Sequence, residues 1–208
     1  MRSTRLWIAL TAASWLFTVF LLPGWLRPDY HPLAQYISEL GATGAPHAGW
    51  VNWAGYLPSG LFFAIALASF WRHWRPRGVQ AAGLALLFCE PLAWIGSAIF
   101  PCDLGCPAQG SLAQNLHNVL ALFTYTGTAL GVTLLACAAN LQRWQRAGWL
   151  LLVVLWLGLF VAMLAPELAS LRGLMQRLGE ALMYGTQAVV GWVLVARRPC
   201  PQRTDRRR

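Results

Sequence analysis

Residues 54–100 read AGYLPSGLFFAIALASFW–RHWRPRG–VQAAGLALLFCEPLAWIGSAIF, two apolar runs joined by an arginine-rich turn. At about 1.5 Å per helical residue, the runs 54–71 and 79–100 are each long enough to cross a hydrocarbon core of about 30 Å. Backbone polar groups inside a bilayer must be satisfied within the segment, so both runs are predicted to be helices. The stretch is therefore predicted to be a transmembrane hairpin.

Four more apolar runs have similar lengths and lie at residues 6–26, 119–139, 148–165 and 179–196. The first follows a basic start but is too long for a signal peptide and lacks a small-x-small cleavage site, so we expect it to be retained. With 57% hydrophobic and 11% charged residues, the composition excludes an ordinary soluble domain. The predicted fold class is all-α, a polytopic six-transmembrane-helix bundle formed by residues 1–196.

The basic residues are concentrated at the termini and in every second connection between the apolar runs. All sixteen are arginines, and thirteen fall in four clusters: Arg2 and Arg5; Arg72, Arg75 and Arg77; Arg143 and Arg146; and Arg197, Arg198, Arg203, Arg206, Arg207 and Arg208. Cytoplasmic loops carry the excess of arginine, so both termini are predicted to be cytoplasmic. Residues 197–208 are expected to form a disordered basic tail. The use of arginine without lysine hints at a GC-rich bacterial genome, which favours a bacterial plasma (inner) membrane.

A net charge of +9 can indicate nucleic-acid binding. Here the arginines flank apolar spans and form no basic stripe interleaved with stacking aromatics, so we expect no nucleic-acid partner. Anionic lipid head groups are the expected partners of the arginine loops. The sequence does not predict the oligomeric state.

The opposite connections are longer and polar. They hold the candidate binding residues Ser38, Glu39, Gly41, Asp103, His117 and Asn118, together with His31 and His47. All lie at one predicted membrane face, so we expect them to converge on a polar pocket there. Cys102 and Cys106 lie in the same region, either as a disulfide or as two free thiols; both readings are open.

The last of these connections has a helical pattern of its own. Leucine or methionine recurs at helical spacing at Leu168, Leu171, Leu174, Met175 and Leu178. This predicts a short amphipathic helix in the outer interface. The alternative is an early start of the sixth span.

Glu90 is the one carboxylate deep within a span, and Pro91 after it predicts a kink. Intramembrane acids usually face a partner or a cavity, because burying a charge in the bilayer is costly. A role in handling protons or ligand and a structural role are both open. The expected partners are water or a hydroxyl of Thr124, Tyr125 or Thr128. Gly127 and Gly131, with Gly-x-x-x-Gly spacing, favour internal helix packing over dimerisation.

No diagnostic catalytic motif accompanies the outer polar residues. His31, His47, Asp103 and His117 are chemically able to bind zinc, but their spacing matches no known metal motif. Candidate catalytic residues are His117, Asp103, Ser38 and Glu39, as an acid–base set or a Ser38–His117–Asp103 triad. We predict no cofactor, with zinc as the alternative.

Short motifs connect the chain with a known family. The element Ile37-Ser38-Glu39-Leu40-Gly41-Ala42 follows His31-Pro32-Leu33, and later come Phe100, Pro101 and Asp103, then Gly110, His117 and Asn118. These resemble the signature of a bacterial membrane family catalogued as domain of unknown function 998. The resemblance covers about residues 6 to 196. It implies about six helices and a role for the matched polar residues, and it supplies no reaction.

We therefore expect a binding protein rather than an enzyme, with a lipid or small amphiphile held in a polar pocket at the outer face. Glu90 and the kinked third span are expected to let this pocket reach inward. The alternative is an intramembrane metal-dependent or acid–base hydrolase, or a lipid-modifying enzyme, that uses the outer His, Asp and Glu residues. The third reading is a small transporter with Glu90 as its proton-handling residue.

Overall fold

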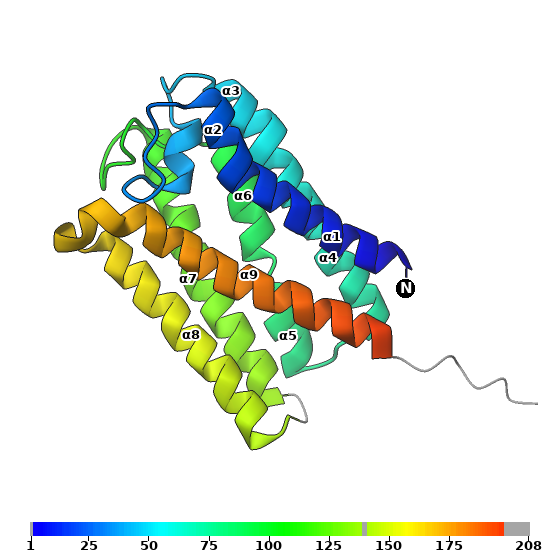
Figure 1. The fold of residues 1–208 in the computed structure, drawn as a ribbon. Helices are drawn as coiled ribbons and strands as arrows, with labels where there is room; N and C mark the ends of the chain where they lie inside the picture. Colours follow the sequence, from blue (N-terminus) through cyan, green and yellow to red (C-terminus); the bar gives the residue numbers. More distant parts are fainter. Residues whose placement is uncertain (1, 139–140, 198–208) are drawn as a thin grey trace, which may run out of the picture.

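The computed structural model describes residues 2–138 and 141–197, and this part of the chain is helical and contains no strand (Figure 1). Within it, six helical spans are long and apolar enough to cross a membrane: Ser3–Leu26, Ala48–Trp74, Val79–Ile99, Leu112–Cys137, Arg143–Leu164 and Pro166–Ala196. The predicted all-α, six-span fold class is thereby confirmed.

The first two spans contain a proline that follows a widened helical turn. Span one consists of α1 (Arg2–Leu16), the π-helix η1 (Phe17–Leu21) and α2 (Leu22–Leu26), which holds Pro23. Span two consists of α3 (Ala48–Trp50), the π-helix η3 (Val51–Tyr56) and α4 (Leu57–Trp74), which holds Pro58. A proline lacks an N–H and its ring clashes with the carbonyl four residues earlier. The π turns relieve that clash while keeping the span continuous.

Span three is broken where the sequence predicts a kink. It divides into α5 (Val79–Leu86) and α6 (Cys89–Ile99), with a turn at Leu87 and Phe88. Pro91 lies four residues after Leu87, so its ring and missing N–H disrupt the helix at Leu87. The break places Glu90 in the first turn of α6, in the interior of the bundle.

The remaining spans begin earlier than the apolar runs indicate. They are α7 (Leu112–Ala138), α8 (Arg143–Leu164) and α9 (Arg172–Arg197), the last preceded by the 3₁₀ helix η4 (Pro166–Leu171). The predicted separate amphipathic helix is wrong, because residues 172–178 are the first turns of α9. The alternative, an early start of span six, is confirmed. Of the predicted stripe, Leu168 and Leu171 lie in η4, and Leu174, Met175 and Leu178 lie in the first turns of α9.

The six spans form a ring in chain order (Figure 1). Helix α1 packs against α4, α4 against α6, both α5 and α6 against α7, α7 against α8, and α8 against α9. Contacts between α9 and α1 close the ring. Aromatic residues fill much of its interior, including Tyr125 stacked against Trp156 and Phe160.

Small residues bring neighbouring helices together. A Cβ on Gly131 would lie 2.8 Å from the carbonyl oxygen of Gly83 on α5, and one on Gly127 would lie 2.9 Å from Cys89 Sγ. The Gly-x-x-x-Gly pair therefore serves internal packing, as the sequence predicts.

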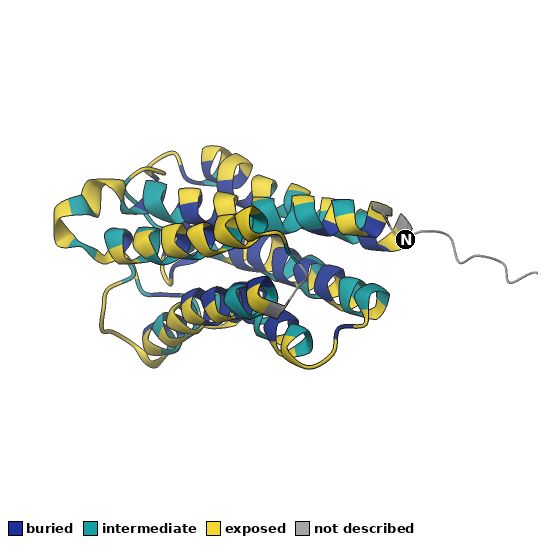
Figure 2. Cartoon of the chain, turned by 90° about the horizontal axis from the view of Figure 1, so that it is seen from below, coloured by how far each residue is buried: buried dark blue, intermediate teal, exposed yellow. Residues whose placement is uncertain are grey.

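The outer surface of the ring is apolar along the helices. Figure 2 shows exposed residues along the outward faces of the helices, and many of them are large hydrophobics, such as Leu151, Val154 and Val161 on α8. Such a surface is stable in contact with lipid chains and not with water. This burial pattern agrees with a multi-pass membrane protein.

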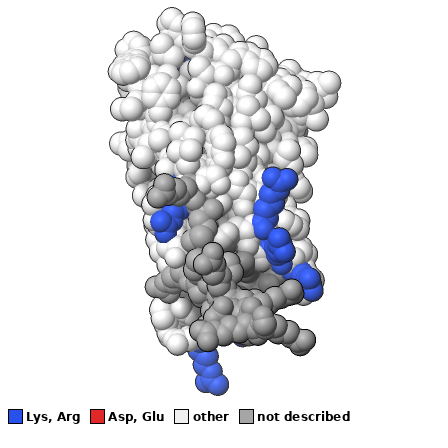
Figure 3. Space-filling model, turned by 90° about the vertical axis from the view of Figure 1, so that its right-hand side faces the viewer, with Lys and Arg blue, Asp and Glu red and all other residues white. Residues whose placement is uncertain are grey.

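The two ends of the bundle differ in composition. We call the end that carries residues 27–47, 101–111 and 165–171 the loop end (upper left in Figure 1). Figure 3 views the opposite side, where arginine side chains are exposed and no acidic residue of the described chain is visible. The predicted tail lies almost wholly outside the described residues. Which end faces the cytoplasm remains a prediction.

Candidate functional site

Residues 32–36, which precede η2 (Ile37–Gly41), are held against the start of α9 by hydrogen bonds and close packing. Arg172 Nη2 lies 3.1 Å from Glu39 Oε1, Arg172 Nε donates to Ala34 O, and the guanidinium lies 4.5 Å from the centre of the Tyr36 ring. At Gly173 a Cβ would collide with the carbonyl oxygens of Pro32 and Gln35, so only glycine permits this approach. These contacts fix the position of Arg172 at the loop end of the bundle.

Arg177, one turn further along α9, satisfies carbonyl groups of the same segment. Its Nη1 donates to Pro32 O at 2.7 Å and to Gln35 O at 3.1 Å, and its Nη2 donates to the hydroxyl of Tyr30. Burial raises the pKa of Tyr30 to about 12, so the phenol is neutral and donates to the carbonyl of Tyr36. Arg177 is thus a structural cation, held by carbonyl and hydroxyl oxygens.

The Ser-Glu-Leu-Gly element forms η2. Glu39 is buried, and its carboxylate accepts from Tyr36 N and Gln35 Nε2 as well as from Arg172. A Cβ on Gly41 would collide with Asn52, whose Nδ2 donates to Gly41 O at 3.0 Å. Glu39 and Gly41 therefore hold η2 in place, and Ser38 is the member of the element that reaches the cavity described below.

Residues 101–111, which we call the disulfide loop, contain the Cys102–Cys106 bond and contact η2. Cys102 and Cys106 are joined by a disulfide in the structure, which corresponds to one of the two open readings. Ser38 Oγ lies 3.3 Å from Cys106 Sγ, and Thr43 N donates to Cys102 O at 2.7 Å. Asp103 accepts hydrogen bonds from the backbone N–H and hydroxyl of Ser111, so its carboxylate organises the start of α7.

A cavity of about 540 Å³ lies between the loop end and the middle of the bundle. Its walls come from η2, the end of η3, the disulfide loop, α6, α7, α8 and α9. Of the candidate binding residues, Ser38, His117 and Asn118 line it, whereas Glu39, Gly41, Asp103 and Glu90 do not. The predicted convergence is therefore found for three of the six outer candidates, and Glu90, which was expected to let the pocket reach inward, does not line it.

His117 presents a fixed tautomer at this cavity. Its Nδ1 lies 3.1 Å from Phe100 O, and a carbonyl can only accept, so Nδ1 carries the hydrogen. In the neutral ring Nε2 is then an acceptor. Asn118, the next residue, donates to Ala108 O at 3.0 Å and accepts from Gln114 Nε2 at 2.8 Å. Asn118 thereby fastens the disulfide loop to α7.

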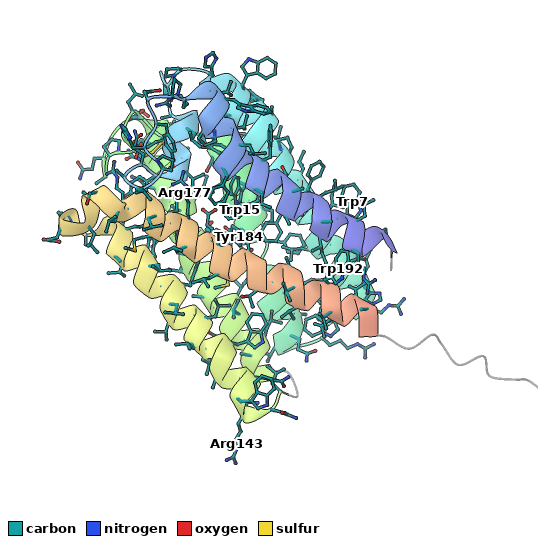
Figure 4. The ribbon with its side chains drawn as sticks, in the orientation of Figure 1. Trp7, Trp15, Arg143, Arg177, Tyr184 and Trp192 are labelled. Atoms are coloured by element: carbon teal, nitrogen blue, oxygen red, sulfur yellow. A yellow bond between two sulfur atoms is a disulfide. The ribbon has the colours of Figure 1, made fainter. Side chains whose placement is uncertain are left out.

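Helix α9 contributes a polar stripe that the apolar pattern of the sequence does not reveal. Arg172, Gln176, Glu180 and Tyr184 recur every four residues and all line the cavity. Gln176 Oε1 accepts from Ile37 N at 2.7 Å. Glu180 Oε2 accepts from the indole nitrogen of Trp15 at 2.8 Å. Figure 4 shows Trp15, Arg177 and Tyr184 in this region of the bundle. The four-residue spacing of polar side chains is the signal that could have identified Glu180.

Glu90 belongs to a separate buried cluster. Its side chain is 0% exposed, and Oε1 accepts from Thr128 Oγ1 at 2.9 Å and from Gln187 Nε2 at 2.8 Å. Its Oε2 and Gln187 Oε1 have no hydrogen-bond partner. Of the expected partners, Thr128 is confirmed. Gln187 was missed because it lies on a helix almost a hundred residues away in sequence.

The structure does not bring the other candidate metal-binding and catalytic residues together. No group of three or more His, Cys, Asp or Glu residues within the described ranges is arranged to hold a metal ion. His31 and His47 are exposed and do not line the cavity. In a Ser38–His117–Asp103 triad, Asp103 would accept from the histidine Nδ1, but that position is taken by Phe100 O.

The six apolar helices and the cavity on one side of their ring define a polytopic helical membrane protein with a pocket lined mainly by α6 to α9. The family model "Protein of unknown function (DUF998)" matches residues 10–193. The chain belongs to this family, as its Ser38, Leu40 and Gly41 element indicates. Searches of curated proteins and of solved structures found no match.

Proposed function

We propose that the protein binds a membrane amphiphile in the cavity bounded by η2, the disulfide loop and α6 to α9. The observation that carries this proposal is one cavity whose lining combines polar and apolar side chains. Ser38, His117, Arg172, Gln176 and Glu180 provide the polar groups. Its volume of about 540 Å³ lies within the range of about 300 to 1,000 Å³ that is typical of small-molecule sites.

Two membrane-facing leucines favour a ligand that comes from the bilayer. Leu122 of α7 and Leu164 at the end of α8 line the cavity, yet they are 55% and 57% exposed. On a helix surrounded by lipid, exposed leucine contacts acyl chains. The cavity therefore extends to the lipid-facing surface between these helices, where an apolar tail can remain in the membrane while the head lies inside.

No specific observation favours the other two readings. A hydrolase would require the Ser38, His117 and Asp103 side chains to interact, and their hydrogen bonds run to other groups. Proton-coupled transport would connect Glu90 with the ligand, and Glu90 does not line the cavity. Both readings remain predictions from the sequence.

The test is the lipid content of protein purified in a mild detergent, measured by mass spectrometry against a total membrane extract. Ala121 lines the cavity, so Ala121→Trp fills it; Ala68 is exposed on α4 and remote from the lining, so Ala68→Trp is the matched control. We expect one lipid class to be enriched in the wild type and in Ala68→Trp, and several-fold less in Ala121→Trp.

Equal enrichment in all three proteins, or no enriched class in the wild type, would contradict the proposal. Ala93→Trp, on the wall formed by α6, serves as a second filling variant if Ala121→Trp does not fold. Elution volume and thermal unfolding in detergent establish folding for each variant.

A further inference from the structure

Glu180 is a buried carboxylate that forms no ion pair within the described chain. It is 6% exposed, lines the cavity, and its only hydrogen bond within the described chain is from Trp15 to Oε2. A neutral indole N–H supplies one donor to a group that can accept about four hydrogen bonds. Buried charges are normally paired, because an unpaired one is costly.

The nearby arginines do not fill this role. Arg177 lies three residues before Glu180 on α9, but both of its Nη atoms donate to carbonyl or tyrosine oxygens. Arg172 lines the cavity and is paired with Glu39 at 3.1 Å. Among the groups that line the cavity, the Glu180 carboxylate is therefore the one acid, and it has no ion-pair partner within the described chain.

The remaining walls suit a cation. Seven aromatic side chains line the cavity: Tyr36, Tyr56, Trp94, Tyr125, Trp156, Phe160 and Tyr184. Around Glu180 they form contacting pairs, with the Trp156 and Tyr184 rings 6.1 Å apart and the Tyr56 and Trp94 rings 5.5 Å apart. The faces of aromatic rings attract cations, and sites for organic ammonium groups combine such rings with a carboxylate.

We propose that the cavity is selective for amphiphiles with an ammonium head, and that Glu180 is the residue that binds the charge. This inference rests on the proposed function and names its ligand class. The ammonium group lies against Glu180 Oε1 within the aromatic walls, and the tail leaves past Leu122 and Leu164. For a primary amine, His117 Nε2 is a second acceptor. An anionic head would be repelled by Glu180, and a neutral head would leave its charge unpaired.

The experiment titrates radiolabelled decylammonium, decanol and decanoate into the protein in uncharged maltoside micelles and measures saturable binding. The three probes share a tail and differ in the charge of the head. Glu180→Gln removes the charge with little change of shape, and Glu167→Gln removes an exposed acid of the same end as the matched control. Losing a charge-assisted contact weakens binding by about tenfold or more.

In the wild type and in Glu167→Gln, decylammonium should bind at least about tenfold more tightly than decanol, and Glu180→Gln should abolish that preference. Similar affinities for all three probes in the wild type, or an unchanged preference in Glu180→Gln, would overturn the selectivity and leave the amphiphile site standing. If no probe binds saturably to the wild type, the proposed function and this inference both fail. The wild-type comparison alone remains decisive if Glu180→Gln does not fold.

Discussion

The geometry of the cavity depends on single residues at which two segments touch. At Gly173 the backbone of α9 meets the carbonyl oxygens of Pro32 and Gln35, and this contact sets the position of Arg172 and η2. Neither residue type nor spacing marks Gly173 as special in the sequence, because the segment it touches is far away along the chain. Contacts of this kind become visible only in three dimensions.

Gly173→Ala should lower the free energy of unfolding by about 1 to 3 kcal/mol, the usual cost of overpacking. Gly185, on the same helix, has open space around its Cα, so Gly185→Ala should be neutral or raise stability by up to about 1 kcal/mol. Thermal unfolding in detergent compares the two variants. Equal stability of both would show that the approach of residues 32–35 to α9 is not tight.

Part of the site could be predicted from the residue types in the sequence. Ser38, His117 and Asn118 were predicted as binding residues because they are polar and lie in the connections that the arginine pattern places on one membrane face. All three line the cavity. Glu180 was missed because a charged residue next to an apolar run was read as the edge of a span. Its helix continues in both directions, which places a carboxylate that looks like a boundary residue in the interior.

At the scale of the element, proline and polar clusters shape the helices. The break between α5 and α6 was predicted from Pro91, since the loss of one hydrogen bond is a local property. Helix starts were predicted several residues late, because polar residues such as Asn115 and His117 continue α7 beyond its apolar run. The hydropathy of a segment indicates whether lipid or water surrounds it. It does not indicate the residue at which the helix begins or ends.

Glu90 joins α6 to α7 and α9, through Thr128 and Gln187. Glu90→Gln preserves an acceptor for both and adds an N–H that can reach the unpartnered Gln187 Oε1, so we expect stability equal to that of the wild type or higher. Glu90→Leu leaves the amide donor of Gln187 buried and unpaired, at a cost of about 1 to 3 kcal/mol.

Thermal unfolding of the two Glu90 variants in detergent provides the comparison. If Glu90→Gln were as unstable as Glu90→Leu, the carboxyl group itself would be required. That outcome would contradict a purely structural cluster and favour the proton-handling reading.

At the scale of the whole molecule, the sorted charges and the ring of helices have separate consequences. The apolar runs predicted six spans, and the arginine clusters predicted that the polar connections share one end, where the structure brings them together. The closure of the ring through α1 and α9 could not be read from the sequence. It depends on which faces of the helices meet.

The most direct test of the account is a high-resolution structure of the protein in nanodiscs made from its native membrane lipids. We predict elongated density in the cavity, with its head within hydrogen-bond distance of Glu180 and its tail passing between Leu122 and Leu164 toward the bilayer. A cavity filled by rearranged side chains, or holding only water in the native lipid, would contradict the account.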